Sequence, residues 1–110
     1  MEEIIIKDNV ISHLSSITEV LYKKGYFGFK ENAKKYVDEI LDFIYNDLTK
    51  PFTKHKPTPI KLRRYGMFYA TFSPNKQTSW YVFFNTKDSR YIVKFVTNNH
   101  SKAANDLNRL

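Results

Sequence analysis

Hydrophobic positions along the chain follow two different periods, and the change between them divides the sequence. In the first part apolar residues such as Val10 and Leu14 recur every three or four positions, which predicts an amphipathic helix that ends near Gly25. The same spacing predicts a second helix over about Lys30–Leu48. The link Tyr26–Phe29 is short, so we expect the two helices to form an antiparallel hairpin.

Strand-like patterns lie on both sides of these helices. A β-branched run at Glu3–Lys7 predicts an N-terminal strand, and three prolines keep Lys50–Pro59 out of a helix or a central strand. Apolar and polar residues then alternate in three runs joined by turn-like links, at Gly66–Ser73, Thr78–Asn85 and Arg90–Thr97. The pattern predicts a single α+β domain over residues 1–110: an N-terminal strand, a helical hairpin, a three-stranded antiparallel meander and a short C-terminal helix or tail.

Alternation also predicts which strand residues share a face. In the second run Trp80 and Tyr81 are expected to point to opposite faces of the strand, although both of its faces are aromatic. In the last run we expect Tyr91, Val93, Phe95 and Thr97 on one face and Ile92, Lys94 and Val96 on the other. A charged side chain avoids an apolar interior, so Lys94 should lie on a solvent-facing side of the sheet, with Tyr81 beside it.

Charge changes along the chain as sharply as the hydrophobic period does. Residues Met1–Leu48 have nine acids and six lysines, whereas Thr49–Leu110 has twelve basic residues and two acids, so the halves carry −3 and +10. A basic, aromatic sheet on an acidic helical support suits a polyanion. The simpler alternative is a soluble α+β domain with a high isoelectric point.

Composition excludes several kinds of chemistry. The chain has no cysteine, so disulfides, iron–sulfur clusters and thiol catalysis are excluded. Its three histidines, His13, His55 and His100, lack metal-ligand spacing, and we expect no metal or other cofactor. The N-terminus is neither a signal peptide nor a membrane span, so a cytoplasmic location without membrane contact is expected.

Four segments together resemble the RelE/ParE superfamily of bacterial toxin–antitoxin toxins. Lys61–Gly66 is a basic turn leading into the sheet, and Thr78–Phe84 is a central aromatic strand. Arg90–Ser101 contains the last strand and the polar turn after it, and Tyr26–Ala33 has a helical sequence typical of members with long hairpins. The resemblance covers nearly the whole chain.

This resemblance implies a metal-independent endoribonuclease that cuts messenger RNA, commonly on the ribosome, and that a cognate antitoxin silences. In such toxins a 2′-hydroxyl attacks the adjacent phosphate while side chains move protons and cations hold the added negative charge. His100, in the polar turn Asn98–Ser101, matches the histidine of some relatives and is the candidate acid or base; the alternative is a surface turn histidine.

Other candidate residues follow from charge and aromaticity. The candidate catalytic set contains His100, Arg63, Arg64, Tyr81 and Lys94, and the candidate RNA contacts are Lys61, Tyr65, Arg90, Asn98, Asn99 and Lys102. The arginine pair suits a bidentate phosphate contact, or simply caps a strand in solvent. Exposed tyrosines suit stacking on bases, although strand aromatics usually form core. Asn98 and Asn99 are equally typical turn formers, His13 is expected to be structural, and His55 lies in a loop where an RNA contact is one alternative.

The sequence also departs from the superfamily pattern. RelE-type nucleases often carry an arginine where this chain has Tyr81, and lysines in the preceding strand, which here reads Met67–Phe72. Two further functions therefore stay open: a ParE-like inhibitor of DNA gyrase, and a family member without activity. All three readings include an antitoxin partner with acidic residues.

Overall fold

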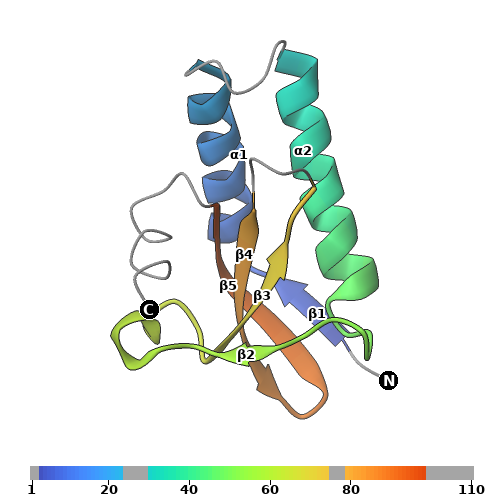
Figure 1. Ribbon diagram of the computed structural model, residues 1–110, viewed down its shortest axis with the longest axis vertical. Helices are drawn as coiled ribbons and strands as arrows, with labels where there is room; N and C mark the ends of the chain where they lie inside the picture. The colour runs from blue at the N-terminus through green and yellow to red at the C-terminus, as the bar shows by residue number, and fades with distance from the viewer. Residues whose placement is uncertain (1–2, 24–29, 75–78, 99–110) are drawn as a thin grey trace.

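A computed structural model describes residues 3–23, 30–74 and 79–98 of the chain. Within them lie two α-helices and a five-stranded sheet, so the α+β class predicted from the sequence is confirmed (Figure 1). The predicted link between the helices and the predicted C-terminal helix or tail fall outside the described residues.

The helices begin close to where the hydrophobic period predicts them. Helix α1 covers Asp8–Lys23, and α2 covers Lys30–Asp42 and continues as one π-helical turn, η1, over Phe43–Asp47. In that turn the Leu48 amide donates to the Phe43 carbonyl at 3.0 Å, five residues back, which brings Phe43, Ile44 and Leu48 onto the buried side. The helical stretch that the pattern predicts to Leu48 thus ends in a widened turn.

The sheet has the strand order β1-β5-β4-β3-β2. Its strands are β1 (Glu3–Ile6), β2 (Lys56–Pro57), β3 (Phe68–Phe72), β4 (Trp80–Lys87) and β5 (Arg90–Asn98). Strand β1 runs parallel to β5, and every other neighbouring pair is antiparallel. The pattern did not predict β2, which lies at the sheet edge, where proline is tolerated.

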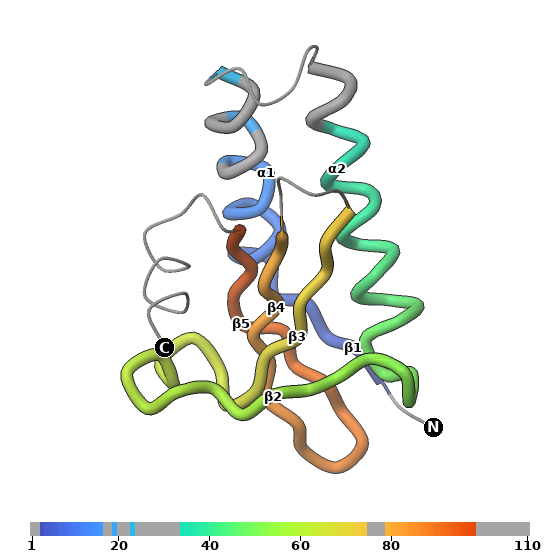
Figure 2. The backbone as a smooth tube through the Cα atoms, in the orientation of Figure 1, coloured from blue at the N-terminus to red at the C-terminus, as the bar shows by residue number. Residues whose placement is uncertain are grey.

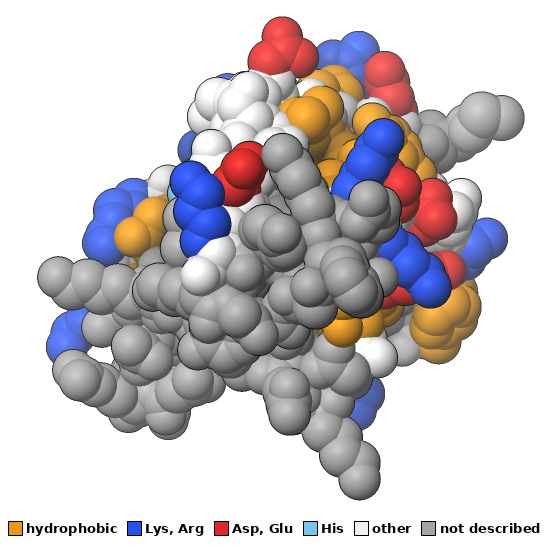
Figure 3. All heavy atoms as spheres, turned by 90° about the horizontal axis from the view of Figure 1, so that it is seen from above, with side chains coloured by type: hydrophobic (Ala, Val, Ile, Leu, Met, Phe, Trp, Pro, Cys, Tyr) orange, Lys and Arg blue, Asp and Glu red, His pale blue; other side chains and the backbone are white. Residues whose placement is uncertain are grey.

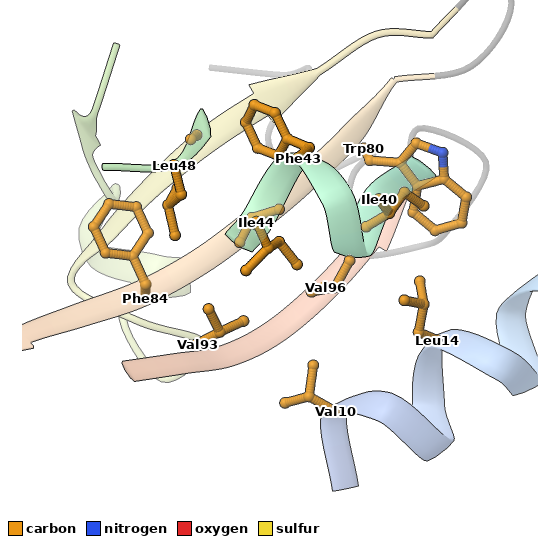
Figure 4. Packing of buried hydrophobic residues seen from close by; sticks show 12 residues of the cluster. Val10, Leu14, Ile40, Phe43, Ile44, Leu48, Trp80, Phe84, Val93 and Val96 are labelled. Atoms are coloured by element: carbon orange, nitrogen blue, oxygen red, sulfur yellow. The ribbon is translucent and has the colours of Figure 1, made fainter. Parts of the chain in front are cut away.

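The core lies between the two helices and one face of the sheet. Figure 4 shows Leu14 of α1 and Ile40 of α2 beside the Trp80 ring, and Leu48 beside Phe84. From β5, Val93 and Val96 join this cluster. Burial of these large side chains removes apolar area from water, which stabilises the fold by about 25 cal/mol per Å² of buried area. This layer therefore holds the sheet against the helices.

One expectation about β5 was wrong, and a β-bulge is the reason. Phe84 pairs with Val93 and Phe83 with Phe95, so Lys94 is an extra residue in the ladder. The bulge breaks the alternation: Val93 and Val96 face the helices, whereas Phe95 and Thr97 lie on the other side of the sheet from Val93. The sequence had placed Phe95 and Val93 on one face.

Candidate nucleic-acid interface

The sheet face opposite the helix-side core carries a group of aromatic rings, which we call the aromatic face. Tyr69 comes from β3, Tyr81 and Phe83 from β4, Phe95 from β5, and Tyr65 from the segment before β3. Since Trp80, Val82 and Phe84 point into the helix-side core, alternation directs Tyr81 and Phe83 the other way, as predicted for Tyr81.

The Thr58–Gly66 segment folds over part of this face and brings Tyr65 to it. A short 3₁₀ helix, η2 (Ile60–Leu62), buries Leu62, and backbone bonds from Leu62 to Pro59 and from Tyr65 to Leu62, both 2.9 Å, hold the turn. Figure 2 follows this segment from β2 around to β3. Gly66 lies so close to β4 that an added Cβ would stand 2.8 Å from the Phe84 amide nitrogen, so only glycine fits there.

The rings of the aromatic face are in mutual contact. Tyr65 stacks on Phe95 with 4.5 Å between ring centroids and packs 5.6 Å from Phe83. Tyr69 lies 5.8 Å from Phe83 and 6.4 Å from Tyr81. Phe83 is fully buried, whereas the three tyrosines are half-buried and keep part of each ring at the surface. Three partly exposed rings on a rigid sheet form a platform of the kind on which unpaired bases stack.

Burial raises the pKa of the Tyr81 hydroxyl above its ordinary value, and the neighbouring Tyr69 hydroxyl adds to the rise. The Tyr81 hydroxyl therefore stays protonated to a higher pH than an exposed tyrosine does.

Arg64 is fixed at one end of this face. Its guanidinium carbon lies 4.5 Å from the centre of the Tyr65 ring, Nη1 donates to the Lys61 carbonyl at 2.8 Å, and Nη2 donates to the Tyr65 hydroxyl at 3.0 Å. A guanidinium has five N–H groups, so these two contacts leave it donors for an anion. Because the side chain is exposed and already oriented, less rotamer entropy is lost when a phosphate binds.

The structure brings together only some of the residues that the sequence nominated. Arg64, Tyr65 and Tyr81 belong to the aromatic face, exposed Lys61 lies in η2, and half-exposed Lys94 lies in the bulge beside Phe95. Arg63 follows η2 but its Nε donates to the Thr58 carbonyl at 3.3 Å, so the two arginines have separate anchors.

Two other nominated residues have contacts outside the ring cluster. Arg90 begins β5 and forms an exposed ion pair with Glu3, with 3.5 Å between Nε and Oε2. Asn98 is buried and pairs with Trp80, whose side chain faces the helices. The burial of Asn98 does not favour an RNA contact, whereas the contact of the exposed Arg90 stays a prediction. His100, Asn99 and Lys102 lie outside the described residues.

Sequence reasoning missed His13 as a neighbour of the aromatic face. Its ring stacks on Phe95 at 4.9 Å between centroids, and its buried Nε2 has no hydrogen-bond partner among the described residues. The expectation of a structural role agrees with this packing. Tyr69, Phe83 and Phe95 were also missed, and strand alternation pointed to Phe83 but could not reveal Phe95 past the bulge.

Charge around the site is one-sided. From Thr49 to Asn98 the chain has a single carboxylate, Asp88, at the turn between β4 and β5. The helical layer differs: seen from its end, acidic and basic side chains lie next to each other among hydrophobic ones over the described surface (Figure 3). The positive charge is therefore concentrated in the part of the chain that forms the sheet side, where it would favour an anionic ligand over a cationic one.

Comparison with models of known families, with curated proteins and with solved structures finds no match to this chain. Among the described residues, no three His, Cys, Asp or Glu side chains are grouped so as to hold a metal ion. None of the described helices combines the length and apolar character needed to cross a bilayer.

Proposed function

We propose that the chain is a RelE-like toxin whose aromatic face binds single-stranded messenger RNA and whose His100 takes part in cutting it. The observation that carries the proposal is the set of partly exposed tyrosines with Arg64 oriented over Tyr65. Stacking supplies about 1–3 kcal/mol per base without sequence preference, and fixed cations supply salt-dependent attraction to phosphates.

The order of elements supports the same proposal. A strand, two helices that pack together and three successive antiparallel strands are the arrangement that the RelE/ParE resemblance implies, with a helical hairpin followed by a meander. In this proposal an antitoxin with acidic residues neutralises the toxin by covering basic parts of the sheet, and the ribosome presents the RNA.

The proposed chemistry needs no metal. The O2′–P bond forms and the P–O5′ bond breaks; the 2′-hydroxyl proton goes to a base, and an acid returns a proton to the leaving 5′ oxygen. His100 takes part in this proton transfer because an unperturbed imidazole exchanges protons near neutral pH. Arg64 and Lys94 hold the negative charge that the phosphorane gains.

Cleavage in a translation extract tests the proposal. Wild-type protein should produce RNA fragments with a 2′,3′-cyclic phosphate, and His100→Ala should reduce the rate by about 10²-fold or more, as is usual for loss of a proton-transfer group. Lys87→Ala, which removes a cation at the β4–β5 hairpin, is the control and should cut at the wild-type rate.

A different result would favour the second reading. Tyr81 stands where RelE-type nucleases often have arginine, which favours a ParE-like gyrase inhibitor. Intact RNA together with inhibition of DNA supercoiling would replace the nuclease proposal with that one. Intact RNA without such inhibition, and growth unaffected by expression, would indicate a family member without activity.

A further inference from the structure

A groove lies at the outer edge of the sheet, where β2 and β3 separate. The two strands pair only at Lys56 with Tyr69 and at Pro57 with Phe68. Before Lys56 the chain leaves the sheet, and the space that opens has a volume of about 350 Å³; it is lined by Phe43, Phe52, Thr53, Lys54, Lys56 and Thr71. We call this space the edge groove.

The backbone of β3 opens into the edge groove at Thr71. The Met67 carbonyl accepts a hydrogen bond of 2.9 Å from the Thr58 amide, on the β2 side of the strand. Peptide groups alternate in direction along a strand, so Tyr69 and Thr71 also turn their N–H and C=O groups to that side. Tyr69 pairs with Lys56, but no described residue pairs with Thr71 there. Such an edge is a template for an added strand.

Phe52 stands beside this edge on a turn that is held firmly. The Thr53 amide donates to the Lys50 carbonyl at 3.0 Å, and Nε2 of His55 contacts the Leu48 carbonyl at 2.6 Å. Phe52 is nonetheless 73% exposed. An aromatic ring that a rigid turn presents to solvent is already ordered for packing against a partner's side chain.

The opposite wall of the groove is rigid as well. Phe43 stacks on Phe72 with 4.9 Å between ring centroids, so the wall is part of the helix-side core. The polar lining is basic: Lys54 and Lys56 are exposed, and no carboxylate is among the described residues that line the groove. An occupant with negative charge is favoured over one with positive charge.

We propose that the edge groove binds an extended acidic segment of a partner protein, which adds to the sheet as a strand beside Thr71 and packs an apolar side chain against Phe52. Main-chain hydrogen bonds, an apolar anchor and flanking charges together are the recognition mode of strand addition. The proposal does not depend on RNA cleavage.

Fluorescence anisotropy with short labelled peptides tests it. The peptides have about eight residues and alternate Val, Leu or Phe with Asp or Glu, a length that suits one strand. The acidic peptides should bind the full chain, and versions with Lys in place of the acids should bind at least about tenfold more weakly. Addition of an acidic peptide should also shift the amide resonance of Thr71.

Three variants separate the parts of the groove. Thr71→Pro removes the outward N–H group and no bond to β4, Phe52→Ala removes the anchor, and the double change Lys54→Glu with Lys56→Glu reverses the charge. Each should weaken acidic-peptide binding about tenfold or more. The matched controls are Ile60→Ala, a similarly exposed apolar residue in η2, and Lys87→Glu at the hairpin, and both should bind as the wild type does.

Several results would overturn the proposal. Equal affinity for acidic and basic peptides would contradict the preference for an acidic partner. An amide resonance of Thr71 that does not shift when peptide is added would contradict strand addition beside Thr71. Self-association that Thr71→Pro abolishes would make a second copy the occupant. Single-stranded RNA that binds the wild type and loses affinity in the Lys54/Lys56 variant, with no peptide bound, would assign the groove to nucleic acid.

Discussion

At the residue scale, His55 shows a role that the sequence did not reveal. Its Nε2 contacts the Leu48 carbonyl at the end of η1, and its ring lies edge-on to Phe84 at 4.9 Å between centroids. The contact satisfies a helix-end carbonyl that has no partner within the helix. Leu48 lies seven residues away across a proline-rich segment without periodicity, so no pattern links the two. The face of Tyr81, by contrast, follows directly from strand alternation.

The tyrosine pair on the aromatic face predicts a pH effect. The pKa of Tyr81 is raised in the folded protein, whereas the unfolded chain ionises it near the ordinary value of about 10. Between these two pKa values the folded state holds a proton that the unfolded state has lost. The contribution of Tyr81 to the free energy of unfolding is therefore complete below pH about 10 and decreases as pH rises above it.

Tyr81→Phe should therefore lose less stability than the wild type when pH is raised through this range, as measured by urea unfolding. The difference in tyrosinate absorbance between wild type and variant should be centred above pH about 10. A difference titration centred at or below that pH would contradict the burial seen for Tyr81.

At the element scale, the strands after the proline-rich segment were predicted to within about two residues, but their details were not. The two-residue strand β2 is too short to produce a pattern, and it contains a proline. The bulge at Lys94 reverses the alternation of β5, and no change in residue type along the strand indicates where it lies. Both features depend on pairing between distant segments, which local periodicity does not contain. Both also shape the candidate sites, because β2 borders the edge groove and the bulge turns Phe95 to the aromatic face.

The β4–β5 hairpin predicts a stabilising substitution. Lys87 pairs with Arg90, and the two turn residues between them, Asp88 and Ser89, have φ values of 51° and 67°. Such a turn favours glycine at its second position, since a side chain at positive φ costs about 1 kcal/mol. Ser89→Gly should raise the free energy of unfolding by about that amount in urea denaturation.

The matched control is Thr86→Gly, in the adjacent strand, which should lower the free energy of unfolding by about 0.5–1 kcal/mol. If both glycine variants were destabilised equally, the positive φ of Ser89 in this turn would be contradicted.

At the scale of the whole molecule, charge and layering coincide. The acidic half of the sequence forms the helical layer and β1, and the basic half forms the other four strands and the segments that border them. Composition was therefore enough to predict that the positive charge lies on the sheet side, from which we predicted a polyanion as partner. It was not enough to choose the residues, because Arg64 and Arg90 look alike in the sequence, yet one lies over Tyr65 and the other pairs with Glu3.

The central claim is that the aromatic face binds single-stranded RNA, and the salt dependence of RNA affinity in matched variants tests it most directly. A labelled oligoribonucleotide is titrated with wild type, Arg64→Ala, Tyr81→Leu and the control Lys87→Ala at several salt concentrations. Arg64→Ala should weaken binding and reduce the salt slope by about one unit. Tyr81→Leu should weaken binding by about 1–3 kcal/mol without a change in slope. Lys87→Ala should match the wild type. Equal losses in Arg64→Ala and Lys87→Ala, with no effect of Tyr81→Leu, would contradict the account.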